Sequence, residues 1–417
     1  MQVFVAICIL ILMFISIIIN RKILHSSFME PTFLFSNIWL FLLFSSLMFV
    51  DFEYNYHGVI YIIILCLVGF VLNLYVGKIV GENVKKGNFI GFNVHKSNFI
   101  LLVVISLGML VPLLNIRLNG FSISSFLNFD AFLEMNSQMA VDRYSGAHKT
   151  STMMQILMIF EYLSPIIGGY HFASVNDRKN KLLGILGFLP ALANMLVQNT
   201  KNELVGSILF FISTMMIANV YLGKDIHIKF SSLIKWTLTL LGALSGLILT
   251  MLFRLGEINL QNIQTVLNKF LIYAFGQVPT FDYWLENYQG TLRHGLGINT
   301  FIGIFNFLGI STRSIGVYSE YVLIEGFPAN IYTVFRGLIE DFGVLGSFIF
   351  FSFIMGIVMF SYYSLIKRNN IYLSSFILLN GYFFVFYGFI ISPWSYMSYI
   401  LAMFLFLPYL IIVRSSK

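Results

Sequence analysis

The chain has 417 residues, of which 58% are hydrophobic and only 10% are charged, and its mean hydropathy is +0.85. A soluble domain carries about 25% charged residues, so this composition excludes a soluble enzyme, a disordered regulator and a secreted disulfide scaffold. It favours an all-α polytopic membrane protein, because about 20 apolar residues cross a bilayer as one helix. The two cysteines, Cys8 and Cys66, lie in apolar runs and indicate neither a disulfide framework nor a metal site.

Hydropathy read in windows of about 19 residues predicts about eleven membrane-spanning helices in a single integral membrane domain, residues 1–417. Helix is the expected structure, because backbone polar groups in lipid must be satisfied within the segment. The first span lacks a basic stretch before it and is followed by Arg21 and Lys22, which favours a retained helix over a cleaved signal peptide. The predicted spans are residues 1–20, 31–50, 58–77, 98–116, 151–174, 182–198, 204–222, 231–253, 342–366, 371–390 and 396–413.

The distribution of basic residues predicts the orientation. Most of the 25 lysines and arginines lie in short loops that fall on one side of the predicted spans. The positive-inside rule makes this side cytoplasmic, with the N-terminus periplasmic and the C-terminus cytoplasmic. These orientation signals account for most of the net charge of +7, so it does not indicate nucleic-acid binding.

Two long segments, residues 117–150 and 254–341, then lie on the periplasmic side, and we expect the chemistry there. The second precedes the last three spans. It contains the apolar stretch Ile298–Ile310, which is too short to cross the bilayer and suits an interfacial or re-entrant helix.

Arginines in this second segment are the first candidate site. Guanidinium groups bind phosphate oxygens bidentately and stay charged in a low dielectric, so they suit a lipid diphosphate. The competing interpretation is local ion pairing, of Arg336 with Glu340 and of Arg254 with Glu257. Because the sequence has no phosphate-binding loop and no metal-ligand motif, we expect no need for ATP, cofactor or metal. The candidate diphosphate-binding residues of this segment are Arg254, Arg293, Arg313 and Arg336.

A polar pattern leads into the ninth predicted span. Such a stripe is costly in a membrane helix unless it faces protein or a water-filled cavity, and the alternative is solvation at the interface. A continuous helix over residues 330–346 would place on one face Asn330, Thr333, Arg336, Glu340 and Gly343.

Two further charges lie among the earlier spans. Lys201, in the short periplasmic turn 199–203, either adds a cation to the mouth of the bundle or pairs with Glu203 in a solvated turn. Glu161 lies about ten residues into the fifth span, where a charge costs about 2.5–3.5 kcal/mol. We therefore expect it to be protonated or paired, for example with a cation from another span.

Acid–base and stacking candidates complete the set. Histidine and carboxylate groups can accept a proton from an attacking hydroxyl, although a loop histidine is often merely solvated. Tyr283 and Trp284 either stack on sugar rings or lie at the lipid interface. The acid–base candidates are His294, Glu340 and Asp341.

Three short blocks and the layout of the spans resemble one family. The blocks are Thr-Lys-Asn-Glu-Leu at 200–204, Gly-Leu-Gly-Ile-Asn-Thr-Phe at 295–301, and the strongest block at 330–346, which holds Asn330, Thr333, Arg336, Glu340, Asp341, Gly343 and Gly346. With one large outside loop before the last three spans, the chain resembles the Wzy-type oligosaccharide repeat-unit polymerases of bacterial O-antigen and capsule assembly. The resemblance covers most of the chain.

The resemblance implies a GT-C-like glycosyltransferase of the bacterial inner membrane. It implies transfer of a growing glycan from undecaprenyl diphosphate onto a new lipid-linked repeat unit, with the outside arginines holding the diphosphate. Implied partners are the undecaprenyl-diphosphate-linked oligosaccharide, the lipid bilayer, a chain-length regulator and a flippase. Some family members place ten residues between an outside arginine and a glycine, whereas nine separate Arg336 from Gly346 and Arg293 from Gly303 here.

Two alternatives remain at this stage. O-antigen ligases share the layout and differ in the acceptor, which is the lipid A core. A lipid-linked oligosaccharide flippase or another secondary transporter usually shows paired repeats and polar sites at the midplane, and the sequence shows neither two matching halves nor many midplane charges.

The charge distribution makes a topology prediction. A reporter that is active only in the periplasm should be active when fused near residue 285, and inactive near residue 180 or at the C-terminus, because basic residues flank the latter two positions. The reverse pattern of reporter activity would contradict periplasmic chemistry.

Overall fold

The computed structural model describes residues 1–20, 27–83, 87–145, 149–198, 201–224, 260–290, 295–311 and 318–414. Within these residues, seven helical stretches are long and apolar enough to cross a membrane, and three further apolar helices are shorter. The seven are α2 (Pro31–Phe49), α3 (His57–Asn83), α4 with α5 (Val94–Gly108 and Leu110–Leu118), α7 (Thr152–Ser174), α8 with α9 (Arg178–Leu186 and Leu189–Gln198), α10 (Asn202–Leu222) and α15 (Thr333–Ile366); the shorter ones are α1 (Gln2–Ile18), α16 (Ile371–Tyr387) and α17 (Met397–Val413). A helical, multi-pass membrane protein is therefore confirmed, and each of these helices coincides with a predicted span.

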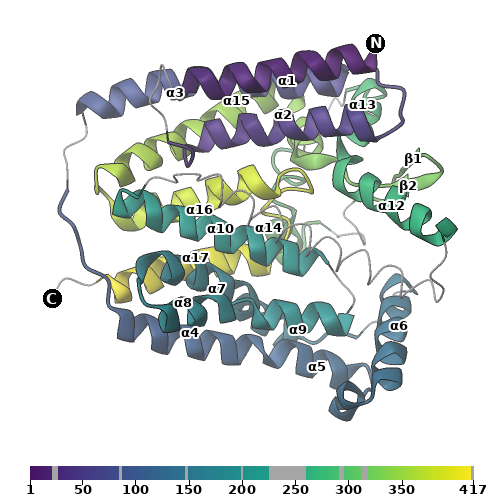
Figure 1. The fold of residues 1–417 in the computed structure, drawn as a ribbon, viewed down its shortest axis with the longest axis vertical. Coiled ribbons are helices and arrows are strands. Elements are labelled where there is room, and N and C mark those ends of the chain that lie inside the picture. The colour runs from purple at the N-terminus through teal and green to yellow at the C-terminus, as the bar shows by residue number, and fades with distance from the viewer. Residues whose placement is uncertain are drawn as a thin grey trace.

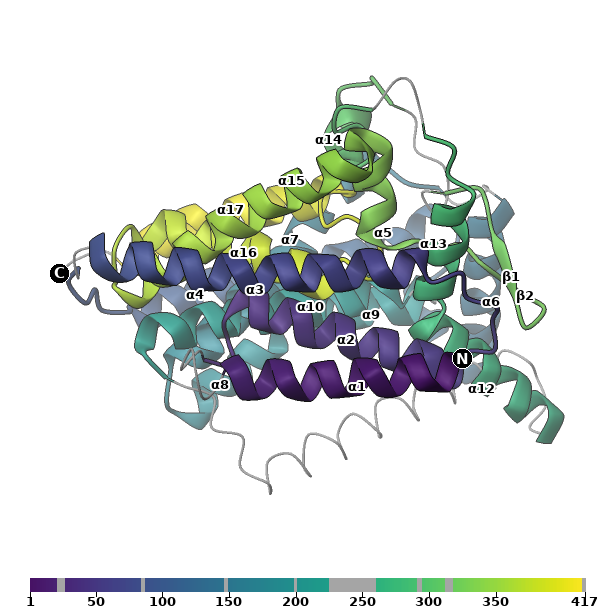
Figure 2. The ribbon, with the colours of Figure 1, turned by 90° about the horizontal axis from the view of Figure 1, so that it is seen from above.

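The apolar helices lie side by side and alternate in direction, with the two chain termini at opposite ends of the bundle (Figure 1). The elements between the spans gather mainly at the end where the N-terminus lies, which we call the loop end (Figures 1 and 2). These elements are η2 (Ile123–Leu127), α6 (Phe129–Ser145), α12 (Leu260–Phe275), α13 (Gln277–Glu286), α14 (Ile302–Phe307) and the antiparallel strands β1 (Val322–Ile324) and β2 (Phe327–Ala329). The two long segments predicted to share one side of the membrane thus share one end of the bundle.

The predicted span 231–253 lies outside the described residues. Its flanks are described. Lys224 lies at the end opposite the loop end, where its Nζ donates to the carbonyl of Ala173 at the end of α7 (3.1 Å). The next described element is α12, which lies at the loop end (Figure 1). The two flanks therefore lie at opposite ends of the bundle.

Side-chain caps set several helix ends. The four first N–H groups of a helix lack partners within it, so an acceptor just before the helix stabilises its start. Asn93, Ser151 and Asp177 accept from backbone N–H groups at the starts of α4, α7 and α8. The Glu30 carboxylate does the same for α2. Gly223, with a left-handed φ of 67°, ends α10.

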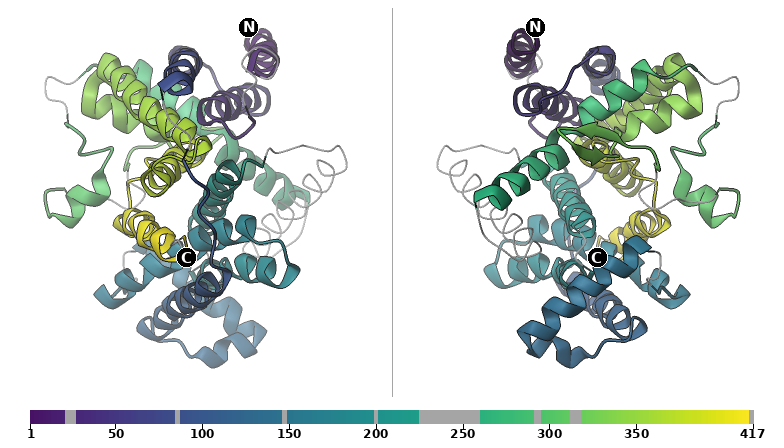
Figure 3. Two further views of the ribbon diagram at one scale, coloured as in Figure 1. Left: turned by 90° about the vertical axis from the view of Figure 1, so that its left-hand side faces the viewer. Right: turned by 90° about the vertical axis from the view of Figure 1, so that its right-hand side faces the viewer.

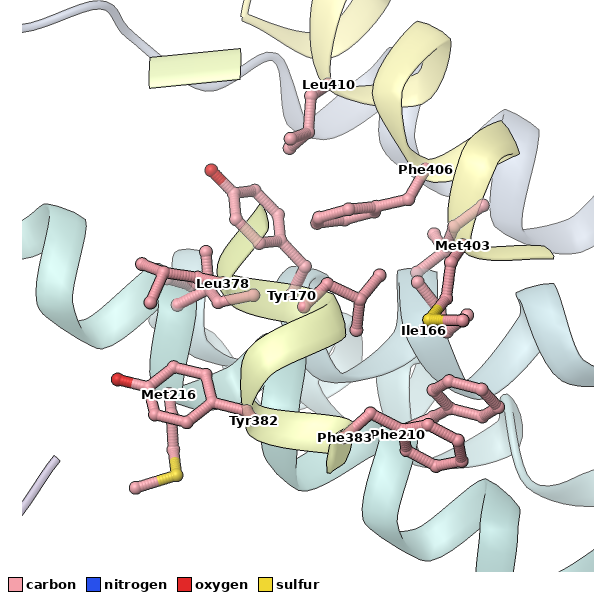
Figure 4. Close-up of a cluster of buried hydrophobic side chains, with 14 of the residues drawn as sticks. Ile166, Tyr170, Phe210, Met216, Leu378, Tyr382, Phe383, Met403, Phe406 and Leu410 are labelled. Atoms are coloured by element: carbon pink, nitrogen blue, oxygen red, sulfur yellow. The ribbon is translucent and has the colours of Figure 1, made fainter. Parts of the chain in front are cut away.

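Helix α16 lies between two apolar cores, and end-on views show the helices arranged around it (Figure 3). One core joins α4, α7, α10, α16, α17 and the later part of α15, and the other joins α1, α2, α3, α13, α15 and α16. Neighbouring residues of α16 serve different cores. Phe383 stacks on Phe210 with ring centroids 3.7 Å apart (Figure 4), whereas Phe384 packs toward Phe351.

Two helices predicted at the loop end are shorter than expected. Only Ile302–Phe307 of the apolar stretch 298–310 is an α-helix, because Gly297 and Gly309 adopt left-handed conformations that do not continue one. The polar pattern at 330–346 is also not one continuous helix. Asn330 follows β2, whose pairing with β1 keeps the chain extended, so Asn330 does not share a helical face with Arg336.

Helix α15 itself is bounded and divided by left-handed residues. Thr333, its first residue, has a φ of 68°, which is strained for a β-branched side chain. Gly343 (φ 70°, ψ 172°) breaks the helix, so that Val334–Phe342 forms a short helical piece at the loop end. The long apolar part follows Gly343, close to the predicted start of the ninth span.

A short segment, residues 87–93, crosses the end of the bundle opposite the loop end and connects α3 to α4 (Figure 1). We call it the strap. Its backbone is hydrogen-bonded to three other helical segments. The bonds join Gly87 N to Lys367 O (2.7 Å), Ile90 N to the Tyr221 hydroxyl (2.7 Å), Arg414 Nη1 to Ile90 O (2.8 Å) and Asn93 N to Val413 O (2.8 Å).

Close packing of α7 on α10 makes a stability prediction. A Cβ at Gly169 would collide with the Phe211 carbonyl and lie 2.5 Å from Thr214 Oγ1. Gly169→Ala should therefore lower the free energy of unfolding by about 1–3 kcal/mol. Gly356 in α15 has open space around it, and Gly356→Ala should be neutral or stabilising by up to about 1 kcal/mol. Thermal unfolding of both variants in lipid tests this, and equal melting temperatures would contradict the packing.

Candidate functional site

Arg336 is the centre of the candidate site. It lies one turn into α15, at the loop end, and only 5% of the residue is exposed. A guanidinium keeps its charge in almost any environment, so a buried one must be compensated by its neighbours.

Three aromatic rings surround this guanidinium. Its Cζ lies 4.0 Å from the ring centroid of Tyr318, 4.3 Å from that of Tyr332 and 5.2 Å from that of Trp284. The faces of aromatic rings carry negative partial charge and attract cations, more strongly where water is excluded. We call Arg336 with these three rings the arginine box.

Two carboxylates complete the surroundings of Arg336. Its Nε donates to Glu340 Oε1 and its Nη2 donates to Glu320 Oε2, each at 2.8 Å. The local ion pair with Glu340 that the sequence allowed is therefore present. The side chain of Glu320 is 67% exposed, so water solvates its carboxylate and weakens its attraction to the buried guanidinium.

The third nitrogen of the guanidinium, Nη1, is buried and has no hydrogen-bond partner in the described part of the chain. A buried donor without an acceptor is costly, and such groups often mark a binding site. Burial, and then the negative charge of Glu340, raises the pKa of the Tyr318 hydroxyl, so this ring stays neutral beside Arg336. The arginine box thus offers one unused N–H group and one weakly held carboxylate.

Asp341, next to Glu340, holds the turn before α14. Its two carboxylate oxygens accept from the backbone N–H groups of Asn299 (3.0 Å) and Thr300 (2.6 Å). The side chain is fully buried, and a Cβ at Gly295 would collide with it. With both oxygens occupied, Asp341 fixes the Gly-Leu-Gly-Ile-Asn-Thr-Phe block against α15.

Asp282 acts in the same way on a different segment. Its carboxylate accepts from the backbone N–H groups of Asn55 (2.8 Å), Tyr56 (3.1 Å) and Gly58 (2.7 Å) and so anchors the start of α3 to α13. The two aspartates therefore hold separate backbone segments. Among the described residues, no group of three or more histidine, cysteine or acidic side chains is arranged to hold a metal ion.

The connection between α16 and α17 contacts both the turn held by Asp341 and the start of α10, next to Lys201. Ser392, in the connection between α16 and α17, donates to the carbonyl of Thr300 (2.5 Å). Further along the same connection, the Tyr396 hydroxyl accepts from the side chain of Asn202 (3.4 Å), which follows Lys201. The structure therefore brings the 201–204 part of the first block, the 295–301 block and the start of α15 to one end of the bundle.

Glu161 is buried, but its partner is not a cation. The side-chain amide of Asn194 lies 3.2 Å from both carboxylate oxygens, and the Asn194 oxygen accepts in turn from Asn115 (2.8 Å) and Gln198 (3.0 Å). This network of neutral amides hydrogen-bonds the carboxyl group without the desolvation cost that a buried lysine or arginine would add. The expected cation from another span is absent from the contacts described here.

Several predicted site residues cannot be placed. Arg254, Arg293, His294 and Arg313 lie outside the described residues. Conversely, no sequence pattern indicates a role for Glu320 or Tyr318. Both precede α15 by more than twelve residues in a segment without periodicity, and only the fold brings them onto Arg336.

The chain was compared with protein-family models, with curated proteins and with solved structures, and none of the three comparisons finds a match.

The contacts of Asp341 predict a structural effect. Asp341→Asn should lower the free energy of unfolding by about 1–3 kcal/mol, because an amide nitrogen would face one of two buried N–H donors. The exposed Asp130 on α6 offers a matched control as Asp130→Asn. Thermal unfolding and limited proteolysis of residues 295–311 measure the effect. Unchanged stability of Asp341→Asn, with activity lost, would instead indicate a chemical role.

Proposed function

We propose that the chain is a polymerase of lipid-linked oligosaccharide repeat units at the periplasmic face of the bacterial inner membrane. It would have about eleven spans in a GT-C-like arrangement, with the N-terminus periplasmic and the C-terminus cytoplasmic. The observation that carries the proposal is Arg336, a buried guanidinium at the loop end whose Nη1 has no hydrogen-bond partner among the described residues. The sequence blocks that resemble the Wzy-type polymerases meet at this end of the bundle.

The substrate diphosphate would bind at Arg336 by replacing Glu320. With its two carboxylates the arginine box carries one net negative charge, so a diphosphate cannot simply be added to it. Glu320 is the more exposed of the two partners, at 67% against 21% for Glu340. Two phosphate oxygens, one accepting from Nη1 and the other from Nη2, would form the bidentate contact that guanidinium groups favour. In this proposal, Glu320 occupies the place of the substrate anion when no substrate is bound.

Further cations are needed for a diphosphate. Lys201 reaches the same end of the bundle, and Arg254, Arg293 and Arg313 belong to the same long segment as Arg336. Charges that are arranged in advance stabilise a leaving group more than mobile solvent does.

The transfer would need a base and a leaving group. A hydroxyl oxygen of the acceptor sugar attacks the anomeric carbon of the donor glycan, and the bond from that carbon to the diphosphate oxygen breaks. The diphosphate keeps the electron pair, and the hydroxyl proton passes to a carboxylate. Glu340 is our candidate base, because it contacts Arg336 and is partly exposed. His294 is the other candidate, and Asp341 positions the turn at residues 299–300.

Deletion of the gene distinguishes a polymerase from the two alternatives, a ligase and a flippase. Loss of a polymerase leaves single repeat units on the carrier or core, as seen on a gel of surface polysaccharide. Loss of a ligase leaves long chains unattached, and loss of a flippase leaves neither product outside.

Two variants of the arginine box test the proposed site. Arg336→Lys should lose most polymerase activity while keeping expression, because an ammonium cannot reproduce the bidentate fork. Glu320→Gln should retain activity or raise it, since it removes the competing carboxylate. Polymer length on a gel and extension of a lipid-linked repeat unit by purified protein provide the measurements. Equal loss in both variants would show that the Arg336–Glu320 pair is structural and would contradict the proposal.

A further inference from the structure

A cavity lies beside the arginine box. It has a volume of about 650 Å³ and opens at the loop end between the turn that precedes α3, helix α13 and strand β1. Its size is within the range of about 300–1,000 Å³ that is typical of small-ligand sites. The lining residues are Phe52, Glu53, Asn55, Tyr283, Tyr321, Val322 and Leu323.

The cavity adjoins the arginine box through two pairs of consecutive residues. On α13, Tyr283 lines the cavity and Trp284 stacks on Arg336. Before β1, Tyr321 lines the cavity and Glu320 pairs with Arg336. The cavity and the arginine box are therefore neighbours along α13 and along the segment before β1.

The walls of the cavity are held in place by hydrogen bonds. The turn before α3 is fixed to α13 by Asp282, which accepts from three of its backbone N–H groups. The same turn is fixed to the strand hairpin by Glu325, whose Oε1 accepts from the backbone N–H of Asp51 (3.0 Å). Such anchoring reduces the conformational entropy lost on binding, so the cavity is pre-organised.

The chemistry of the lining favours an uncharged, hydroxyl-rich ligand. Phe52, Tyr283 and Tyr321 provide aromatic faces, on which the C–H face of a sugar ring can stack. The exposed carboxylate of Glu53 and the amide of Asn55 can accept and donate hydrogen bonds to hydroxyl groups. The lining residues that the structure describes include no lysine or arginine and one acid, Glu53, and these side chains do not suit phosphate.

We propose that this cavity is a saccharide-binding subsite, which holds neutral sugar residues of the lipid-linked oligosaccharide while its diphosphate lies at Arg336. The subsite rests on the proposed function for the identity of the complete substrate, but saccharide binding can be measured separately. Glu53 binds sugar hydroxyls, and Tyr283 and Tyr321 stack on the rings.

Saturation-transfer NMR on the purified full chain in lipid nanodiscs tests the subsite. The probes are soluble oligosaccharides released from the surface polysaccharide of the cell of origin, together with a panel of neutral monosaccharides. We expect saturation transfer with the unmodified chain, its loss in Tyr283→Ala and Tyr321→Ala, and an affinity about tenfold weaker in Glu53→Gln, as for loss of one charged hydrogen bond.

Matched variants outside the cavity serve as controls. Tyr75→Ala removes an exposed tyrosine far along α3, and Glu134→Gln removes an exposed carboxylate on α6, and both should bind as the unmodified chain does. All these side chains are exposed, and equal melting temperatures will show that the variants are folded. Arg336→Lys should also keep saccharide binding.

The outcomes separate this inference from the proposed function. Binding that depends on Tyr283, Tyr321 and Glu53, without extension of lipid-linked units, would support the subsite and contradict the polymerase. Extension with unaltered saccharide binding and unaltered KM in the cavity variants would support the polymerase and overturn the subsite. No saturation transfer in the unmodified chain, or its loss in Arg336→Lys with the fold intact, would also overturn the subsite.

Discussion

A charge taken out of water must be compensated by its neighbours, and the structure depends on how this chain does so. Arg336 is compensated by two carboxylates and three rings. Asp282 and Asp341 accept from backbone N–H groups of segments distant in sequence. The aspartates therefore fix the loop-end elements to the bundle. Apolar contacts alone are not directional and would not fix these positions.

The buried charges at the loop end have two kinds of partner, fixed backbone N–H groups and one exchangeable side chain. Backbone donors cannot move away without unfolding a segment, so the aspartates are permanent anchors. Glu320 is exposed and lies in a connecting segment, so it can leave Arg336 without disturbing a helix. A rigid frame with one removable anion is suited to binding an anionic substrate and releasing an anionic product. The cavity beside Tyr283 extends this frame outward from the membrane helices.

The helical membrane fold could be predicted from sequence because a run of about 20 apolar residues has few alternatives in lipid. The ends of helices were less predictable, since α15 begins nine residues before the span predicted from hydropathy, and Gly343 breaks it. The pairing of Arg336 with Glu340 followed from helical spacing. Glu320, Tyr318 and the cavity did not, because they depend on long-range contacts among loops that carry no periodic pattern.

The strap gives the bundle a mechanical asymmetry. By joining the ends of α10, α15 and α17 to the segment between α3 and α4, it prevents these helices from separating at the end opposite the cavity. Buried Arg414, with the ring of Tyr221 3.9 Å from its Cζ, strengthens that join. Any widening of the bundle to admit a bulky lipid-linked molecule must then be a fan-like splay with its pivot at the strap, and small rotations there become large displacements at the far tips of the helices.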